Sequence, residues 1–304
     1  MEKNPKENAM KQIIFDCDST VGLPGKPMDD VLALLYLLGR PREARILGIT
    51  CTFANGTARE VFASTKTFLR EIARQDIPLL PGADKCEDPR SEAAHFIVDT
   101  VSAHPGEITL VAIGSLTNLY GAYLLDHQIF EKVKEIVLMG GYTAPVFYHN
   151  RHLEELNFSV NPEAAACVLN HGRNISVLTG NNTLEPSYLP KEEFMDKLCS
   201  GSPSGRYIAE KCGYRFDDKK VTCGDAASYC WDVVATVYLL HPELYQDNYC
   251  HCFVTERGMY SGWLGVTEPA RDTCRLNLPK VKDLTAYRQE MYAGWLNFNL
   301  GETK

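Results

Sequence analysis

Short runs of apolar residues alternate along the chain with longer segments in which apolar residues recur every three or four positions. The short runs are typical of buried strands, and the longer segments have the period of amphipathic helices. We predict strands at 12–15, 46–52, 77–80, 108–113, 135–139 and 175–178, and helices at 29–38, 58–74, 91–103, 116–125, 162–169, 226–240 and 284–299. We expect a hairpin near 256–266 and a loop at 199–222.

Strands separated by helices of this length indicate crossover connections between parallel strands. The predicted fold class is therefore α/β, with a single Rossmann-like, open, mostly parallel sheet and helices on both faces. No linker rich in proline, glycine or serine divides the chain, so residues 12–304 are predicted to form one domain. Residues 1–11 are polar, and we expect a tag or a disordered tail there rather than a signal peptide.

The charge balance limits the expected partners. The chain has 39 acidic and 31 basic residues, which give a net charge of −8. Nucleic acids and anionic membranes attract clustered lysine and arginine, so neither is an expected partner. The longest apolar runs are too short to cross a bilayer. Eleven cysteines without a Cys-x-x-Cys pair indicate a reducing compartment, and we expect a cytoplasmic protein.

Acidic residues concentrate at the carboxyl end of the first predicted strand, where open α/β sheets bind their ligands. Asp16 and Asp18 follow this strand, and Asp29 and Asp30 begin the next helix. Helix capping explains the second pair, because the helix dipole favours carboxylates in a first turn, but it leaves the first pair unexplained. Carboxylates this close repel one another unless a cation compensates. Oxygen ligands favour Ca²⁺ or Mg²⁺, so we predict a metal site in preference to simple capping.

Further motifs at strand and helix ends are weak signals when taken one at a time. Asn55, which precedes a glycine, is by itself more typical of a turn than of a ligand. Asn161 followed by Pro162 predicts a helix N-cap with proline at the first helical position. Trp231 and Asp232 lie too far inside the predicted helix 226–240 for Asp232 to be its cap.

Taken together, the motifs resemble those of the nucleoside hydrolases, the inosine–uridine-preferring superfamily. The resemblance extends in order over about residues 12–298 and implies that residues 12–304 are a nucleoside hydrolase-like catalytic domain. It implies Ca²⁺-dependent hydrolysis of the N-glycosidic bond of ribonucleosides, in a homodimer or homotetramer. It rests on Asp16-x-Asp18, Asp29-Asp30-x-x-Ala33-Leu34, Gly48-Ile49-Thr50 with Asn55, Gly114–Asn118, Val137–Gly141, Glu155-Leu156-Asn157, Asn161–Ala165 and Trp231-Asp232.

The resemblance also implies roles for individual residues. The Ca²⁺ ion would be held by Asp18, Asp30, Asp232 and the main-chain carbonyl of Ile113, with Asp18 also acting as the general base for water. The other implied roles are as follows: Asp29 and Asn157 bind the ribose 2′- and 3′-hydroxyls, Glu155 binds the 5′-hydroxyl with Asn150 as a weaker candidate, Asn55 orients the water or the ribose, Met139 lies under the sugar, Asp232 also contacts the substrate, and Asp16 orders the site from outside.

The chain departs from the family pattern in the spacing of its aspartates. Ten residues, 19–28, separate Asp18 from Asp29, where the family usually has only a few. This glycine- and proline-rich insertion is expected to bulge at the pocket rim, so that Asp18 and Asp29 still converge.

A second departure concerns the leaving base. Trp231 stands where the inosine–uridine-preferring subgroup has a histidine, which makes the chain similar to the purine-specific subgroup. An indole can stack on a purine, so purine nucleosides are the predicted substrates and Trp231 a catalytic residue. The second wall of the base pocket is open, with His95, Phe96, Tyr207 and Tyr214 as candidates. Two alternatives stay open: a ribohydrolase for another riboside (pyrimidine or nicotinamide), and a catalytically weak nucleoside-binding protein.

Overall fold

The computed structural model describes residues 10–84, 86, 88–148, 151–217 and 226–300. The main sheet contains β1 (Lys11–Cys17), β2 (Ala44–Cys51), β3 (Leu79–Leu80), β4 (Ile108–Ala112), β5 (Glu135–Met139), β8 (Ile175–Leu178), β12 (Tyr249–Phe253), β13 (Gly265–Thr267) and β14 (Cys274–Asn277). The helices include α1 (Asp29–Leu38), α2 (Ala58–Glu71), α3 (Glu92–Ala103), α4 (Thr117–Leu125), α5 (Ile129–Lys132), α6 (Pro162–His171), α7 (Gly180–Ser187), α8 (Lys191–Cys199), α9 (Pro203–Cys212), α11 (Trp231–Leu240), α12 (Glu256–Met259) and α13 (Leu284–Asn297). Short strand pairs are β6 (Phe147–Tyr148) with β7 (Arg151–His152), β9 (Tyr188–Pro190) with β10 (Ala227–Tyr229), and β11 (Tyr245–Gln246) with β15 (Lys280–Val281).

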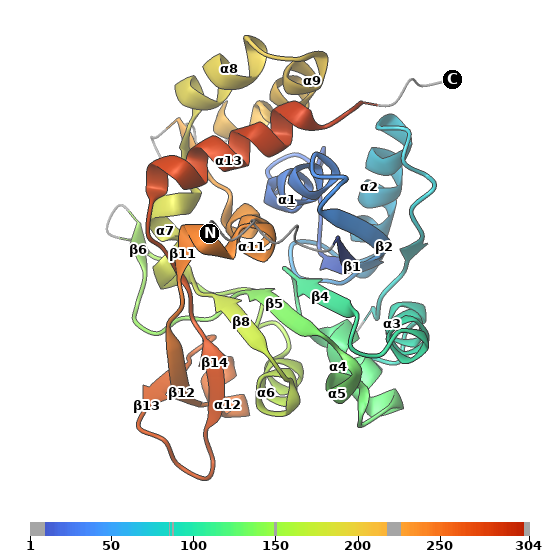
Figure 1. Ribbon diagram of the computed structural model, residues 1–304, viewed down its shortest axis with the longest axis vertical. Coiled ribbons are helices and arrows are strands. Elements are labelled where there is room, and N and C mark those ends of the chain that lie inside the picture. Colours follow the sequence, from blue (N-terminus) through green and yellow to red (C-terminus); the bar gives the residue numbers. More distant parts are fainter. Residues whose placement is uncertain (1–9, 85, 87, 149–150, 218–225, 301–304) are drawn as a thin grey trace, which may run out of the picture.

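Within the described residues, nine strands form the main sheet in the order β13-β12-β14-β8-β5-β4-β1-β2-β3 (Figure 1). The strands from β8 to β3 are parallel to one another, and β14 pairs with β8 in the same direction. In this sheet only β12 runs in the opposite direction, antiparallel to both of its neighbours, β14 and β13. The predicted α/β class with an open, mostly parallel sheet is confirmed.

Each face of the sheet has its own hydrophobic core, because side chains alternate along every strand. In β1, Ile13 and Phe15 pack into the core that includes α1, α11 and α13. Ile14 between them packs into the core that includes α3, α4 and α6 on the other face. Figure 1 shows the two groups of helices on opposite sides of the sheet. No helix in the described part of the chain is long and apolar enough to cross a membrane.

The strand order reverses at β1, and this positions the site. The chain runs from β1 outward to β2 and β3, and then returns to β4 on the other side of β1. The connections that leave β1 and β4 therefore diverge, which opens a crevice at the carboxyl ends of these strands. The aspartates that follow β1 lie at this reversal point.

The predicted helix 226–240 is wrong in its first part. Residues Ala227–Tyr229 form β10, which pairs antiparallel with β9, and α11 begins only at Trp231. This pairing joins segments that are far apart in the sequence, so the local pattern could not indicate it. Asp232 consequently lies in the first turn of α11 rather than well inside a helix.

Three further differences from the prediction concern the expected loop, the expected hairpin and the expected tail. The expected loop at 199–222 contains α9, which begins with an N-cap at Ser202 and a proline at the first position. The expected hairpin at 256–266 begins with the short helix α12, and its strands are β12 and β13. Strand β1 begins at Lys11, one residue inside the segment that we assigned to the tail, and residues 1–9 lie outside the described residues.

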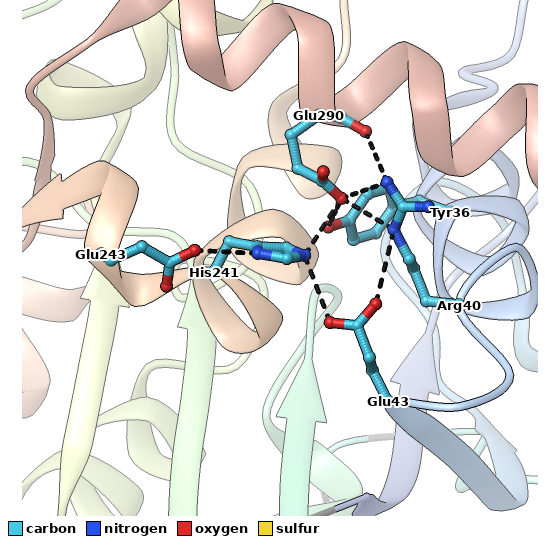
Figure 2. A network of polar contacts seen from close by, with 6 residues as sticks. All are labelled: Tyr36, Arg40, Glu43, His241, Glu243 and Glu290. Atoms are coloured by element: carbon cyan, nitrogen blue, oxygen red, sulfur yellow. Dashed lines mark hydrogen bonds and ion pairs between the residues drawn. The ribbon is translucent and has the colours of Figure 1, made fainter. Parts of the chain in front are cut away.

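The ends of α1 and α11 that point away from the aspartates are joined by a polar network (Figure 2). Glu290 of α13 accepts hydrogen bonds from Tyr36 Oη at 3.0 Å and from Arg40 Nε at 2.7 Å. His241, the C-cap of α11, pairs through Nε2 with Glu290 at 3.1 Å and Glu43 at 3.4 Å, and its Nδ1 lies 2.9 Å from a carboxylate oxygen of Glu243. The network thus ties α1, α11 and α13 together at one end.

We expect this network to stabilise the fold more at low pH than at high pH. Burial disfavours the imidazolium of His241, but Glu290, Glu243 and Glu43 outweigh this and raise its pKa. A histidine whose pKa is raised by folding contributes stability below its unfolded pKa, about 6.5, and loses it as the pH rises through the folded value. His241→Gln should therefore lower the melting temperature more at about pH 6 than at about pH 8.5. The control is His104→Gln, at an exposed histidine after α3; equal deficits at both pH values for His241→Gln would contradict the prediction.

Candidate active site

A cavity of about 230 Å³ lies at the carboxyl ends of β2, β4 and β5, beside the first turns of α1 and α11. Most of the residues predicted for substrate or metal binding line it: Asp29, Asn55, Ile113, Met139, Glu155, Asn157, Trp231 and Asp232. Asp16, Asp18 and Asp30 are each at most 1% exposed and lie in the protein interior. The remaining predicted residue, Asn150, lies outside the described residues.

The insertion at residues 19–28 does not separate the aspartates on either side of it. The Asp18 backbone N–H donates to Oδ1 of Asp30 at 3.0 Å, and Oδ2 of Asp18 accepts from the Asn55 backbone N–H at 2.6 Å. The insertion itself is tied back to the site, because Nζ of Lys26 donates to the carbonyl oxygen of Asn55 at 2.6 Å. Pro27 and Met28, next to the first turn of α1, line the cavity. The insertion thus contributes to the rim, as the sequence predicts.

Three buried aspartates bring their carboxylates together. Asp29, Asp30 and Asp232 each offer one oxygen, and these oxygens lie within 4.8 Å of one another. The three residues occupy the first turns of α1 and α11, two helices that pack against each other and whose positive dipole ends face the cluster. Asp29, expected only at the ribose, is thus part of the same cluster as the expected metal ligands Asp30 and Asp232.

Holding these carboxylates close together in the protein interior is electrostatically unfavourable. Burial, with nearby aspartates adding repulsion, raises the pKa of Asp18 to about 6 and the pKa of Asp30 and Asp232 far above the ordinary range. Burial likewise raises the pKa of Asp29 to about 6. Among the described atoms, Oδ1 of Asp18 and Oδ2 of Asp30 are buried without a hydrogen-bond partner. A hard cation bound by the three clustered carboxylates would offset this repulsion, and unpartnered carboxylate oxygens are the ligands it prefers, so these residues fit a metal site.

Asp16 is held apart from the cavity by side chains of two neighbouring elements. Its Oδ2 accepts hydrogen bonds from Oγ1 of Thr50 in β2 at 2.6 Å and from Nδ2 of Asn118 in α4 at 2.8 Å. Despite these bonds, complete burial raises the pKa of Asp16 to about 7. Because Asp16 links β1 to β2 and α4, its position suits the predicted role of ordering the site from outside.

Asn157 joins the ends of β4 and β5. Its Nδ2 donates to the carbonyl oxygens of Ile113 at 3.0 Å and Met139 at 2.9 Å. The carbonyl expected to bind the metal therefore already accepts one hydrogen bond and keeps a second lone pair. Asn161 caps α6 by accepting from the Ala164 backbone N–H at 3.2 Å, which confirms the predicted N-cap.

Glu155 lines the cavity, but backbone amides hold its carboxylate. Oε1 accepts from the backbone N–H groups of Gly141 at 3.2 Å and Phe158 at 2.9 Å, and Oε2 accepts from Ser159 at 2.9 Å. Burial nevertheless raises the pKa of Glu155. The side chain thus fixes the segment after β5 against the segment before α6, in addition to any contact with the 5′-hydroxyl.

We expect Glu155→Gln to lower the free energy of unfolding by about 1–3 kcal/mol, because the amide places an N–H donor against backbone N–H donors. Equilibrium denaturation in urea measures this loss. The control is Glu154→Gln, which removes the same charge from an exposed neighbour and should change stability by less than about 0.5 kcal/mol. Equal losses for the two variants would show that the carboxylate of Glu155 does not anchor the loop.

The aromatic wall of the cavity differs from the one we expected. Trp231 is half-buried and stacks on Tyr229 of β10, with ring centroids 5.1 Å apart and planes 17° from parallel. Tyr142 and Arg215 also line the cavity. None of Tyr229, Tyr142 and Arg215 was predicted from the sequence as a residue of the site. Of these three, Tyr229 could have been proposed from the sequence, because it stands two residues before Trp231. The four candidates for the second wall, His95, Phe96, Tyr207 and Tyr214, are not among the described residues that line it.

Comparison with known proteins identifies the family. The family model described as inosine-uridine preferring nucleoside hydrolase matches residues 13–282. Uridine nucleosidase 1 of Arabidopsis thaliana is 27% identical over 266 residues, which cover 77% of this chain and 75% of the relative.

Solved structures share the fold at lower sequence identity. A plant nucleoside hydrolase superposes with a TM-score of 0.81 at 20% identity, over 94% of this chain and 99% of that chain. A purine-preferring ribonucleoside hydrolase from Gardnerella vaginalis superposes with a TM-score of 0.78 at 20% identity, over 95% of this chain and 99% of that chain. The family match over most of the sequence, on a fold and a site of this kind, shows that the chain belongs to the inosine-uridine preferring nucleoside hydrolase family and is a ribonucleoside hydrolase, an N-glycosidase.

Proposed function

We propose that the protein hydrolyses purine ribonucleosides to the free base and ribose in a Ca²⁺-dependent reaction. The observation that carries this proposal is the group of buried aspartates, two of whose oxygens have no hydrogen-bond partner in the described part of the chain, next to a cavity lined by polar side chains and an aromatic pair. Asp18, Asp30, Asp232 and the Ile113 carbonyl would hold the ion, and Asp29 is close enough to Asp30 and Asp232 to join them. The bound ion would supply positive charge that acidifies a water molecule and binds the ribose diol.

Asp18 is the proposed general base. Its Oδ2 is fixed by the Asn55 N–H, whereas its Oδ1 has no partner among the described atoms and can take the proton of the attacking water. The sugar becomes oxocarbenium-like as the glycosidic bond breaks. Asp29 and Asp232 then place negative charge where positive charge develops, which stabilises the transition state more than the ground state.

Asn55, Asn157, Glu155 and Met139 are proposed to position the ribose, since all four line the cavity. The backbone bonds of Asn157 and Glu155 hold their side chains in place before the substrate arrives, which lowers the entropic cost of reaching a reactive geometry. Asp16 supports the arrangement through β2 and α4.

The stacked pair Trp231–Tyr229 supports the purine preference, because a broad aromatic surface gains more from a two-ring base than from a one-ring base. The purine-preferring structural neighbour agrees with this preference. Uridine is the second candidate substrate, because a relative that covers 77% of this chain is named a uridine nucleosidase. The two candidates predict opposite rankings of inosine and uridine.

A reducing-sugar assay over inosine, guanosine, adenosine, uridine, cytidine and nicotinamide riboside tests the proposal, with Ca²⁺ or with chelator. We expect ribose release that requires Ca²⁺ and a kcat/KM for inosine about tenfold or more above that for uridine. A higher value for uridine would overturn the purine preference. Nucleoside binding without ribose release would favour the binding-protein alternative. Light scattering tests the homodimer or homotetramer that we propose from the family resemblance.

A further inference from the structure

Arg215 is the one basic side chain among the described residues that line the cavity. The other charged residues in the lining are acidic, namely Asp29, Glu154, Glu155 and Asp232, and none of the described lining residues is a histidine. A cation is therefore placed in a cavity whose remaining charge is negative. Neither the metal site nor the ribose contacts described above use it.

The insertion holds Arg215 in place. Nη1 of Arg215 donates to the carbonyl oxygen of Gly25 at 2.7 Å, and the hydroxyl of the preceding Tyr214 donates to the carbonyl oxygen of Lys26 at 3.4 Å. A guanidinium has five N–H donors in a rigid planar fork, so the bond to Gly25 fixes the group while other donors can reach a ligand. Arg215 and Asp29 both line the cavity, so the guanidinium acts within the site.

The leaving base needs stabilisation as it departs, and among the described lining residues only Arg215 is a cationic hydrogen-bond donor. When the C1′–N bond breaks, its electron pair goes to the base nitrogen, and the base departs as an anion unless it is stabilised. The indole of Trp231 stacks but cannot usefully donate a proton. Burial and the charge of Glu155 raise the pKa of Tyr142, which makes this hydroxyl a weaker acid.

We propose that Arg215 is a catalytic residue that stabilises the departing base by donating hydrogen bonds to its exocyclic carbonyl oxygen. Negative charge moves from the base nitrogen to this oxygen as the bond breaks, and a guanidinium hydrogen bond to it strengthens with that charge. Arg215 keeps its proton throughout. The water oxygen bonds to C1′, the water proton goes to Asp18, and the released base takes a proton from solvent. This inference rests on the proposed function and deepens it.

The proposal defines the substrate class more closely. Hypoxanthine, guanine and uracil carry a carbonyl oxygen conjugated with the departing nitrogen, whereas adenine carries an amino group in place of the carbonyl oxygen of hypoxanthine. A guanidinium donates hydrogen bonds and accepts none, so it favours the oxo-bases. We therefore expect inosine and guanosine to exceed adenosine in kcat/KM, and Arg215→Gln to reduce this discrimination.

The test compares two substrates whose leaving groups differ in how much stabilisation they need in order to depart. Wild type and Arg215→Gln are assayed in the presence of Ca²⁺ with inosine, and with 4-nitrophenyl β-D-ribofuranoside, whose phenolate departs without assistance. We expect kcat/KM for inosine to fall by about 100-fold in the variant, and the loss on the nitrophenyl riboside to be at least about tenfold smaller. Equal losses on both substrates would overturn the proposal, because Arg215 would then serve the sugar or the fold.

Two control variants separate the guanidinium from its surroundings. Arg206→Gln makes the same substitution at an exposed arginine of α9 that also donates to a backbone carbonyl but does not line the cavity. Tyr214→Phe removes the hydroxyl that contacts the insertion and keeps Arg215. Both should keep the wild-type ratio of the two kcat/KM values. If Tyr214→Phe reproduced the selective loss on inosine, bracing of the insertion would explain it and the proposal would fail. A wild type that hydrolyses neither substrate would instead refute the proposed function.

Discussion

Replacement of Asp18 by asparagine is expected to lower kcat/KM for ribonucleoside hydrolysis by about 10³-fold or more while the protein remains folded. The amide keeps the shape of the side chain, and its oxygen can still accept the hydrogen bond from the Asn55 backbone N–H. The backbone N–H of residue 18 still reaches Asp30, so the cluster keeps its geometry. The variant loses the only feature that catalysis requires of Asp18, a carboxylate that takes the proton of the attacking water and binds the ion.

Steady-state kinetics on the best nucleoside measure this effect, with circular dichroism to check the fold. The matched control is Asp99→Asn, at an exposed aspartate of α3 on the other side of the sheet, which should retain wild-type activity. If Asp18→Asn kept activity within about tenfold of wild type, neither general-base catalysis nor metal binding by Asp18 could hold.

The second large effect concerns Ca²⁺ and thermal stability. Folding raises the pKa of Asp18 and Asp29 to about 6 and that of Asp30 and Asp232 further, so the folded state binds more protons than the unfolded state. The unfolding free energy of the metal-free protein must therefore fall as the pH rises from about 4, the unfolded value, through the folded values. Ca²⁺ bound at the proposed site would hold the carboxylates in their ionised form and cancel this loss. At a free concentration of 100 times its Kd it adds about 2.7 kcal/mol.

The expected result is a difference in melting temperature between Ca²⁺ and chelator that is larger at about pH 8 than at about pH 5.5. Asp30→Asn is the comparison variant. It removes one charge from the repelling cluster, so it should stabilise the metal-free protein. This variant should melt at a higher temperature than wild type in chelator at about pH 8 and should gain less from Ca²⁺. A Ca²⁺ effect of the same size in wild type and Asp30→Asn would argue against a metal site in this cluster.

Much of the site could be predicted because its residues stand at the ends of regular elements. Asp16 and Asp18 come at the end of a strand whose apolar alternation is plain, and Asp29 and Asp30 come where a helical period begins. In a parallel sheet, such ends meet at one edge, so the convergence followed from the pattern alone. The cap at Asn161 was predictable for the same reason, since it depends on a few neighbouring residues.

Other features depended on contacts between distant segments. Tyr229 faces the cavity from a strand because Ala227–Tyr229 pairs with Tyr188–Pro190, a choice that helical propensity alone did not favour. Arg215 is held at the cavity by a hydrogen bond to the carbonyl oxygen of Gly25, 190 residues away in the sequence.

The sequence by itself determined the α/β class, the edge of the sheet that carries the chemistry, and the acidic residues found there. These follow from local periodicity and from the direction of parallel strands, which neighbouring residues encode. Only the tertiary structure decided which carboxylates share the cluster, because the packing of α1 against α11 brings Asp232 to Asp29 and Asp30. Only the tertiary structure also decided which aromatic and basic groups face the base, because long-range pairing and the course of the insertion set their positions.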